Sequence, residues 1–182
     1  TKGIDLLLGA FSRLDGTDVR LKLAGRGSVE DQQKLQRLAA DLGIGARVEF
    51  VGSVSDAQRR ELYRRCLFVC TPSRYEGWCI AAVEAAAASK PVIGTRIPGL
   101  MDAVRDGETG HLVESGDVEA LAQAMRQLLA DPGERRRLGA AGRKWAEHFT
   151  WEQIARAQEQ VYETVVTASP SSPHGAIPQA DS

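Results

Sequence analysis

Apolar and polar positions follow two periodicities along this chain, one typical of helices and one typical of strands. Near the N-terminus, apolar residues recur three or four positions apart at Ile4, Leu7, Leu8, Phe11 and Leu14. This spacing predicts an amphipathic helix whose apolar face packs on a sheet. From Val19 to Ala24 apolar and polar residues alternate one by one, which predicts a half-buried strand.

The two periodicities alternate through the first two thirds of the chain. Further strands are predicted at residues 47–51, 67–71, 91–95 and 109–114. Between them, helices are predicted to begin after Ser28 and Ser55, because Asp31 and Gln58 stand three residues later as capping partners. Parallel strands require crossover connections, so the alternation predicts an α/β fold with a Rossmann-like, doubly wound parallel sheet.

The C-terminal third shows only the helical periodicity. Helices are predicted at residues 118–131 and 133–148, and a third begins at the capping box formed by Thr150 and Gln153. The third helix should turn these apolar residues inward: Ile154, Ala157, Val161 and Val165. From residue 168 the chain is rich in Ser, Pro, Gly and Gln, which predicts disorder. We therefore expect one domain over residues 1–167, with a helical C-terminal extension, and a disordered tail over residues 168–182.

Composition narrows the classes of partner. With 182 residues and a formal net charge of −1, the chain can form one core but generates no long-range field for nucleic acid or an anionic membrane. We predict no nucleic-acid partner, and peripheral membrane contact is not indicated. The cysteines lie in or beside apolar segments without a CxxC pair, which favours reduced thiols in a cytoplasmic protein over a zinc site. No transmembrane run or signal peptide is found, and because the sequence starts at Thr1 we expect a fragment of a longer protein.

The candidate chemistry lies in residues 73–84, where two carboxylates, Glu76 and Glu84, are separated by seven residues. An apolar strand ending at Pro72 precedes this stretch, and an Ala-rich helix follows from Ile80. Loops at the carboxyl ends of parallel strands bind ligands, and a helix start offers unpaired N–H groups there. The alternative for Glu76 is an acid favoured at a helix N-terminus. For Glu84, an acid within an apolar helix, the alternative is a structural ion pair.

Other patterns have plainer explanations. Gly25 and Gly27 suggest a dinucleotide-binding loop, but Glu30 stands where the third glycine is needed, so a tight turn is favoured over a dehydrogenase. The arginine clusters at residues 59–65 and 135–137 are interpreted as solvated helix faces rather than an anion-binding patch. The scattered histidines form no catalytic triad, and we identify neither a metal-ligand set nor a cofactor.

The order of short motifs resembles the C-terminal domain of retaining, group 1 glycosyltransferases with the two-domain B-type fold. The resemblance covers residues 2–166 and rests on these motifs: Lys2-Gly3, Leu23 to Gly27, Val48 to Gly52, Thr71-Pro72-Ser73 with Glu76-Gly77-Trp78, Glu84-Ala85, Lys90 to Ile93, Asp106 to Gly110, and Phe149 to Glu152. It implies a nucleotide-diphosphate sugar as co-substrate and sugar transfer in polysaccharide, glycolipid or glycoconjugate synthesis.

The resemblance also implies roles for individual residues. Glu76 would contact hydroxyls of the donor sugar, Glu84 would bind the ribose, and Lys2 would neutralise the diphosphate leaving group. The remaining donor-binding candidates are Gly77, Trp78 and Cys79 at the helix start, Gly25 and Gly27 in the first turn, and Val54 and Ser55 near the base. Two departures from the family pattern stand out: Cys79 replaces a usual glycine, and Met101-Asp102 replaces a usual Pro-Glu.

The resemblance further implies that a piece of the family fold is missing from this sequence. Family members have an N-terminal domain that binds the acceptor, and a strand directly before the helix that Lys2-Gly3 opens. Without that first strand, we expect a gap between the strand at Val19 and the strand at Leu67. The chain alone should then be a marginally stable donor-binding half without transferase activity. A non-catalytic nucleotide-sugar binding module and a B-type-fold phosphorylase or epimerase remain alternatives.

Overall fold

The computed structural model describes residues 1–14, 16 and 18–168. The chain divides into two compact units, Thr1–Glu147 and His148–Ser182. In the first unit the strands are β1 (Leu21–Ala24), β2 (Val48–Gly52), β3 (Val69–Thr71), β4 (Val92–Thr95) and β5 (Gly110–Val113). Its helices are α1 (Ile4–Phe11), α2 (Val29–Asp41), η1 (Gly45–Arg47), α3 (Asp56–Arg65), α4 (Ile80–Ala87), α5 (Pro98–Met101), α6 (Val118–Ala130) and α7 (Pro132–Ala146). After η2 (Glu147–Phe149), the second unit contains α8 (Trp151–Ala168).

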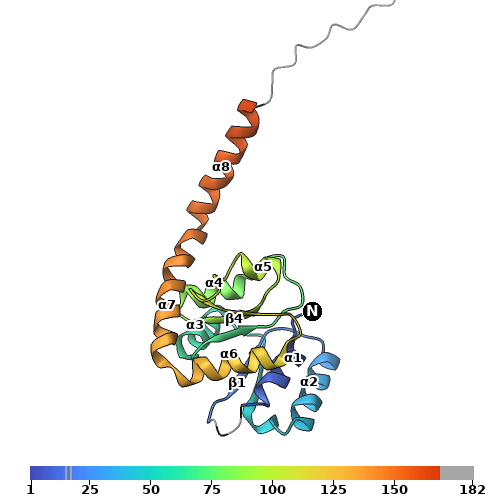
Figure 1. Cartoon of the computed structure of the whole chain (residues 1–182). Helices are drawn as coiled ribbons and strands as arrows, with labels where there is room; N and C mark the ends of the chain where they lie inside the picture. The colour runs from blue at the N-terminus through green and yellow to red at the C-terminus, as the bar shows by residue number, and fades with distance from the viewer. Residues whose placement is uncertain (15, 17, 169–182) are drawn as a thin grey trace, which may run out of the picture. The chain divides into compact units, whose positions relative to one another are not determined.

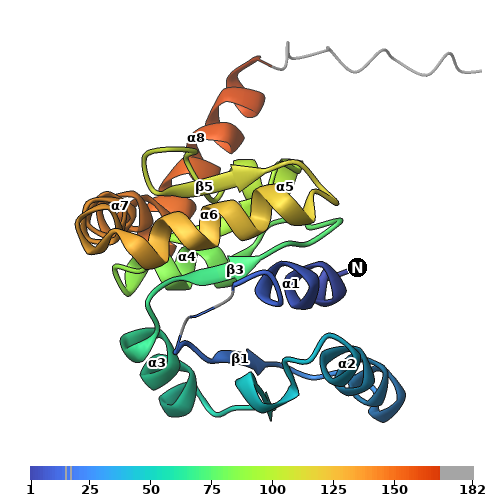
Figure 2. The same cartoon turned by 60° about the horizontal axis from the view of Figure 1, so that its bottom comes forward.

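The strand and helix positions confirm the predicted α/β alternation, and every described strand pair is parallel. The strands form two sheets: β1 pairs with β2, and β3, β4 and β5 form a second sheet with β4 in the middle. Figure 2 shows β1 and β3 as separate strands. The expected gap between these two strands is therefore present in the described part of the chain.

Helices cover both faces of the three-stranded sheet. In Figure 1, α4 and α5 lie above this sheet, and α6 and α1 lie below it. Successive residues of a strand point to opposite faces, so Val92 packs in the core under α4 and α5, while Ile93 packs in the core with α1 and α6. All four residues of β4 are buried, as expected for a strand covered on both sides.

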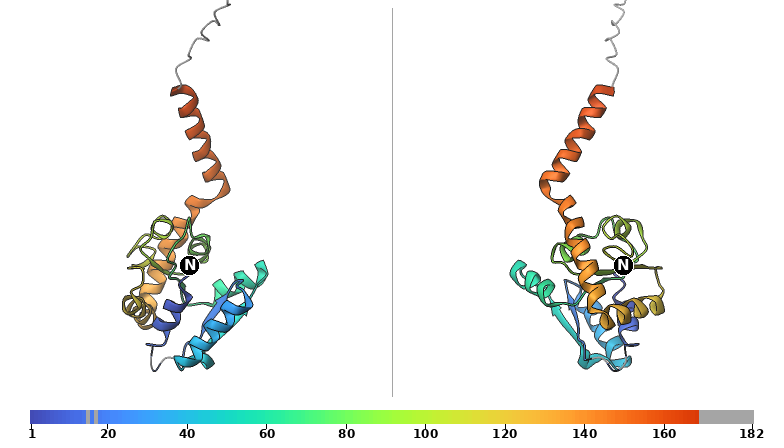
Figure 3. Two further views of the ribbon diagram at one scale, coloured as in Figure 1. Left: turned by 90° about the vertical axis from the view of Figure 1, so that its right-hand side faces the viewer. Right: turned by 60° about the vertical axis from the view of Figure 1, so that its left-hand side comes forward.

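α1 links the two sheets through apolar contacts. It contacts both α2 and α6, and Figure 3 shows these helices beside one another. Leu7, Leu8 and Phe11, which the sequence pattern placed on one helix face, are almost fully buried. The same core includes half-buried residues of β1, so α1 holds the β1–β2 pair against the rest of the first unit.

Helix starts follow the predicted caps. The Ser28 hydroxyl accepts the N–H of Asp31 at the start of α2. The capping box at α3 is complete, with Ser55 and Gln58 each bonded to the other's backbone N–H. Thr150 accepts the N–H of Gln153 at 3.3 Å, which begins α8 as predicted.

The inward face predicted for α8 is wrong for the described chain. Ile154 is 39% exposed, and Val161 and Val165 are each 59% exposed. The apolar spacing predicts the helix and its stripe correctly, but a stripe does not specify what will cover it. The predicted disordered tail falls almost entirely on residues 169–182, which lie outside the described residues.

Candidate functional site

The start of α1 lies directly against the end of β3. Gly3 has φ +67°, and a Cβ atom at this position would stand only 1.8 Å from the Pro72 carbonyl oxygen. Glycine is therefore required here for both reasons, the left-handed backbone and the close approach. The N–H of Arg74 donates to the Thr1 carbonyl oxygen at 2.8 Å. The Lys2-Gly3 pair thus brings the first residues of the chain next to the loop that contains Glu76.

A second contact fixes the same junction. The Arg74 guanidinium donates to both carboxylate oxygens of Asp5, at 2.8 and 2.6 Å. This hydrogen bonding lowers the pKa of Asp5 from its ordinary value, although partial burial opposes the shift. A bidentate pair of this kind constrains orientation as well as distance, so α1 and the loop after β3 are held in one arrangement.

Lys2 and Glu76 form an ion pair at this junction. The Lys2 ammonium lies 2.8 Å from Oε1 and 3.0 Å from Oε2 of Glu76. The Glu76 side chain is 10% exposed, whereas the Lys2 side chain is 65% exposed. Burial raises the pKa of Glu76, but hydrogen bonds from Lys2 and Ser73 outweigh this effect and bring the pKa below its ordinary value. The two predicted catalytic residues are brought together, with Glu76 ionised.

Ser73 orients the Glu76 carboxylate from the buried side. Its hydroxyl donates to Glu76 Oε1 at 2.7 Å, and Ser73 as a whole is 2% exposed. The carbonyl oxygen of Ser73 accepts a hydrogen bond from the hydroxyl of Thr95, which is also buried. Thr95 is the last residue of β4, so the central strand of the sheet supports Glu76 through Ser73. Thr95 was not predicted to belong to the site, and Ser73, though it opens the predicted stretch of residues 73–84, was given no role, although a Ser three residues before the first glutamate is a short enough spacing to have indicated the contact.

The loop from Glu76 to Cys79 packs closely on α5. A Cβ atom at Gly99 would lie 2.5 Å from the Glu76 carbonyl oxygen and 2.7 Å from the carbonyl group of Gly77. The N–H of Cys79 donates to the Gly99 carbonyl oxygen at 3.3 Å. Cys79 is 4% exposed and belongs to the core under α4 and α5, while Trp78 is 37% exposed. Of these donor-binding candidates, the Cys79 amide therefore has a hydrogen-bond partner in α5, and the side chain of Cys79 is structural.

Glu84 lies on α4, one turn after its first residue Ile80. Its side chain is 30% exposed and its partners come from α3. The Tyr63 hydroxyl donates to Glu84 Oε2 at 3.1 Å, and the Arg59 guanidinium lies 3.3 Å from Glu84 Oε1. Arg59 belongs to the cluster interpreted from the sequence as a solvated helix face, and no site role was predicted for Tyr63, so neither partner of Glu84 was predicted. An acid within an apolar helix is costly to bury without a partner, so the sequence indicated that Glu84 has a partner but not which residue it is.

The other donor-binding candidates follow β1 and β2, at the carboxyl ends of those strands. The N–H of Gly25 donates to the Gly52 carbonyl oxygen at 2.9 Å, which ties the two loops together. A Cβ atom added at Gly27 would have no atom within 4 Å, and Val54 is half-buried. The Ser55 hydroxyl caps α3, so its described contact is structural. The structure thus places these four residues in two linked loops.

Comparisons with known proteins bear on these placements. The sequence profile described as "Glycosyl transferases group 1" matches residues 1–145. The chain belongs to this family. It is 37% identical over 168 residues to the MMP alpha-(1->4)-mannosyltransferase of Mycolicibacterium hassiacum, which covers 91% of this chain and 40% of that protein. It is 36% identical to the phosphatidyl-myo-inositol mannosyltransferase of Mycobacterium leprae, covering 91% of this chain and 42% of that protein.

Solved structures confirm the fold of this group 1 glycosyltransferase domain. Sucrose-phosphate synthase from Thermosynechococcus elongatus superposes with a TM-score of 0.83 at 33% identity, over 92% of this chain and 43% of that chain. The C-terminal domain of the group 1 protein LpcC from Francisella tularensis gives a TM-score of 0.73 at 22% identity, over 82% of this chain and 80% of that chain. The chain is therefore a C-terminal-type domain, and it spans about two fifths of the length of the curated relatives it matches.

Further features of the glycosyltransferase domain carry no candidate site. Arg136 and Arg137 are exposed, in line with the predicted solvated helix face, and Arg137 pairs with Glu134. Arg135 differs from that prediction, because it is half-buried and donates to the Leu128 and Leu129 carbonyl oxygens. Within the described residues, no group of His, Cys, Asp and Glu is arranged to hold a metal ion. In the same part of the chain, no helix is both long and apolar enough to cross a membrane.

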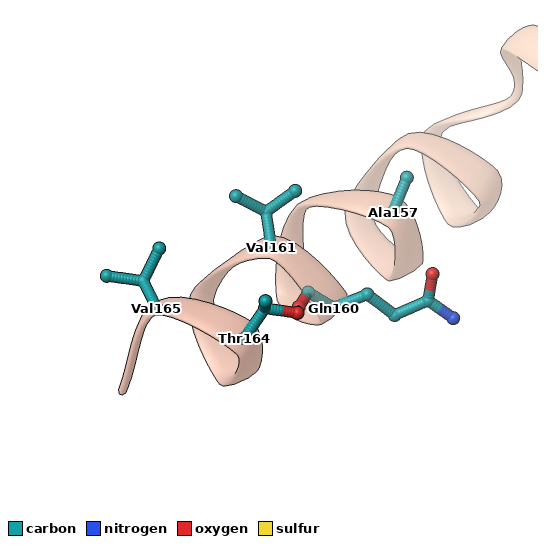
Figure 4. A pocket seen from close by; sticks show the side chains of 5 residues that line it. All are labelled: Ala157, Gln160, Val161, Thr164 and Val165. Carbon is teal, nitrogen blue, oxygen red and sulfur yellow. The ribbon is translucent and has the colours of Figure 1, made fainter. Parts of the chain in front are cut away.

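One shallow hollow lies on α8. Figure 4 shows the residues that line it, all from this helix: Ala157, Gln160, Val161, Thr164 and Val165. The lining contains neither a charged side chain nor a cysteine or histidine. It offers an apolar surface without the groups that would bind a diphosphate or act in catalysis.

Proposed function

We propose that this domain is the donor-binding half of a retaining glycosyltransferase that takes its sugar from a nucleoside diphosphate sugar. In this proposal Glu76 accepts hydrogen bonds from hydroxyls of the sugar, Lys2 faces the diphosphate, and Glu84 accepts hydrogen bonds from the ribose. The product belongs to polysaccharide, glycolipid or glycoconjugate synthesis. The donor is a co-substrate, and the proposal invokes neither a metal nor a cofactor.

The observation that carries the proposal is the ion pair of Lys2 with Glu76, which lies in the loop before α4. The carboxylate is held on its buried side by Ser73, and the exposed ammonium stands beside it. When the bond from the sugar to the diphosphate breaks, positive charge develops on the sugar and negative charge on the departing phosphate. A fixed carboxylate beside a fixed ammonium, with the N-terminus of α4 close by, supplies both complementary charges.

Glu84 supports the second half of the proposal. A carboxylate has room for several hydrogen bonds, and the Glu84 side chain keeps 30% of its surface exposed while Tyr63 and Arg59 approach it. A vicinal diol presents two hydroxyl donors at the spacing of two carboxylate oxygens. Glu84 is therefore suited to the ribose of a ribonucleoside diphosphate sugar.

Transfer to an acceptor is expected to need residues outside this chain. The curated relatives are more than twice as long as the part that this chain matches. We accordingly expect the 182-residue chain to bind a donor without transferring sugar. The Anabaena protein HepE, which shares the fold at 24% identity and a TM-score of 0.79, was solved with UDP, and this makes UDP the first nucleotide to test.

Calorimetric titration of the 182-residue chain with UDP, GDP, ADP and their glucose or mannose conjugates tests the proposal. Glu84→Ala should weaken binding of every ligand that the unchanged chain binds, whereas Glu76→Ala should weaken only the sugar conjugates. Glu108→Ala is the matched control, because Glu108 is an exposed acid paired with Arg105 before the amino end of β5, away from the ligand-binding edge. Failure of all these nucleotides and conjugates to bind, or equal binding by the Glu84→Ala variant, would overturn the proposal.

A further inference from the structure

Both oxygens of the Glu84 carboxylate are met by side chains of α3, a helix that supplies none of the residues assigned to the donor so far. The Tyr63 hydroxyl lies 3.1 Å from Oε2, and the Arg59 guanidinium lies 3.3 Å from Oε1. The two contacts approach from residues four positions apart, which share one face of a helix. A single face of α3 therefore determines where the carboxylate of Glu84 points.

The surroundings of Tyr63 keep its hydroxyl protonated and fixed, so it acts as a hydrogen-bond donor to Glu84. Its ring packs on the core under α4 and α5, and its hydroxyl also lies within 3.4 Å of the Ala81 carbonyl oxygen. Burial raises the pKa of Tyr63, and the charge of Glu84 raises it further, so the hydroxyl keeps its proton across the neutral range. The packed ring cannot follow a carboxylate that rotates, so the hydrogen bond selects one rotamer of Glu84.

Arg59 adds charge without filling the exposed side of the carboxylate. Its guanidinium is 45% exposed and is shared between Glu84 and Asp56, at 3.3 and 3.1 Å. An arginine has five N–H donors, so a contact with one oxygen of Glu84 leaves others on the same group for solvent or a ligand. An exposed pair of this type contributes little to stability, which leaves orientation of Glu84 as its main effect.

We propose that Tyr63 and Arg59 are positioning residues for nucleotide recognition. They hold Glu84 so that the lone pairs on its exposed side accept hydrogen bonds from both ribose hydroxyls of the donor. This inference rests on the proposed function, because it gives Glu84 the ribose as its ligand. It extends the site to α3 and makes the contact between α3 and α4 a determinant of ribose specificity.

A purely structural contact between α3 and α4 leads to a different expectation. Loss of such a contact would lower the stability of the domain and weaken all ligands alike. If the contact positions Glu84, its loss instead lowers affinity mainly for ligands whose ribose hydroxyl donates a hydrogen bond to Glu84. The preference for a ribonucleotide over its 2′-deoxy analogue therefore separates the two roles.

The test measures binding of UDP and 2′-deoxy-UDP by calorimetry, with GDP and ADP and their 2′-deoxy analogues in parallel. Hydrogen bonds to a charged group should make the unchanged chain prefer the ribonucleotide by about tenfold or more. Tyr63→Phe and Arg59→Gln should each reduce that preference by about threefold. Arg60→Gln is the matched control, because Arg60 carries the same charge at the next, exposed position of α3.

Combining the changes distinguishes the possible outcomes. In a Glu84→Ala background the preference should be lost, and adding Tyr63→Phe should change it no further. If Tyr63→Phe and Arg59→Gln weaken UDP and 2′-deoxy-UDP equally, or leave the preference intact, the positioning role is overturned while the function of Glu84 stands. If Glu84→Ala itself leaves the preference intact, the proposed ribose contact fails, and the positioning role fails with it. Arg59→Gln alters a surface residue, so it decides the question even where Tyr63→Phe impairs folding.

Discussion

The Lys2 ammonium contacts both carboxylate oxygens of Glu76, although 74 positions separate the two residues in the chain. The contact depends on Gly3, which lets the start of α1 approach the Pro72 carbonyl group, and on the bidentate pair between Arg74 and Asp5. The Lys2-Gly3 dipeptide therefore has two tasks: the glycine makes the approach possible, and the lysine supplies the charge. Disrupting the approach should disturb the charge pair as well.

Gly3→Ala should destabilise the domain more than an alanine at another left-handed glycine. The left-handed conformation alone costs alanine about 1–2 kcal/mol. At Gly3 the added Cβ would also meet the Pro72 carbonyl oxygen, and relieving such overpacking costs about another 1–3 kcal/mol. Gly43→Ala is the control, since Gly43 has φ +70° and nothing within 4 Å of its Cβ position. Urea unfolding of both variants measures the difference, and equal losses would contradict the close approach.

The stability contributed by Glu76 should depend on pH in one direction. The pKa of Glu76 in the folded chain lies below the ordinary value of 4.5, because the hydrogen bonds from Lys2 and Ser73 outweigh burial. The folded state therefore favours the ionised form, and its contribution is fully present above the unfolded pKa and lost as pH falls through the folded pKa. Urea midpoints of the unchanged chain and of Glu76→Gln, compared from about pH 7 down to about pH 3, should converge at the acid end.

A Glu76→Gln difference that stays constant over this range would show that the carboxylate is not stabilised by its charge. Asp5 also has a lowered pKa and titrates in the same window. The measured quantity is therefore the difference between the two proteins at each pH, in which the contribution of Asp5 cancels.

Much of the fold could be predicted from the sequence because its local signals agree. The helix stripe from Ile4 to Leu14, the capping box of Ser55 with Gln58, and the alternation in residues 19–24 are all short-range patterns, and each is present in the structure. Pairing of strands is long-range, yet a gap beside β3 was expected from the family resemblance, in which a strand precedes the helix that Lys2-Gly3 opens, and the gap is seen in the two separate sheets.

The contacts of the site could be predicted only in part. The family motifs point to Glu76, Glu84 and Lys2 as candidates, because these residues stand at fixed places in the motifs. They did not identify Tyr63 and Arg59, whose contact with Glu84 depends on how α3 packs against α4. The same limit explains the error at α8, where a helical stripe was assigned to a core although Val161 and Val165 are exposed.

Ser73→Ala should lower affinity for nucleotide sugars without changing affinity for the free nucleoside diphosphate. Ser73 holds Oε1 of Glu76 from the buried side, so its loss frees the carboxylate that is proposed to face the sugar. Loss of one hydrogen bond to a charged group predicts an effect of about tenfold or more. Thr109→Ala is the control, because Thr109 is equally buried and its hydroxyl bonds to the backbone of Arg105. Calorimetry should show sugar discrimination retained in Thr109→Ala, and retention in Ser73→Ala would remove Ser73 from the site.

Amide hydrogen exchange should differ between the two sheets. β4 is hydrogen-bonded to strands on both sides and buried throughout, so its amides should exchange only on large-scale opening. β1 has one strand partner and alternates between half-buried and exposed residues, so we expect exchange at least about tenfold faster there.

β5 is the control, because it also lies at a sheet edge and has four residues, but is more buried than β1. If edge position alone decided protection, β1 and β5 would exchange alike; if β1 matched β4, the two-sheet arrangement itself would be contradicted. In a longer polypeptide that supplies a strand between β1 and β3, protection of both strands should rise together, because each would gain a second hydrogen-bonded neighbour.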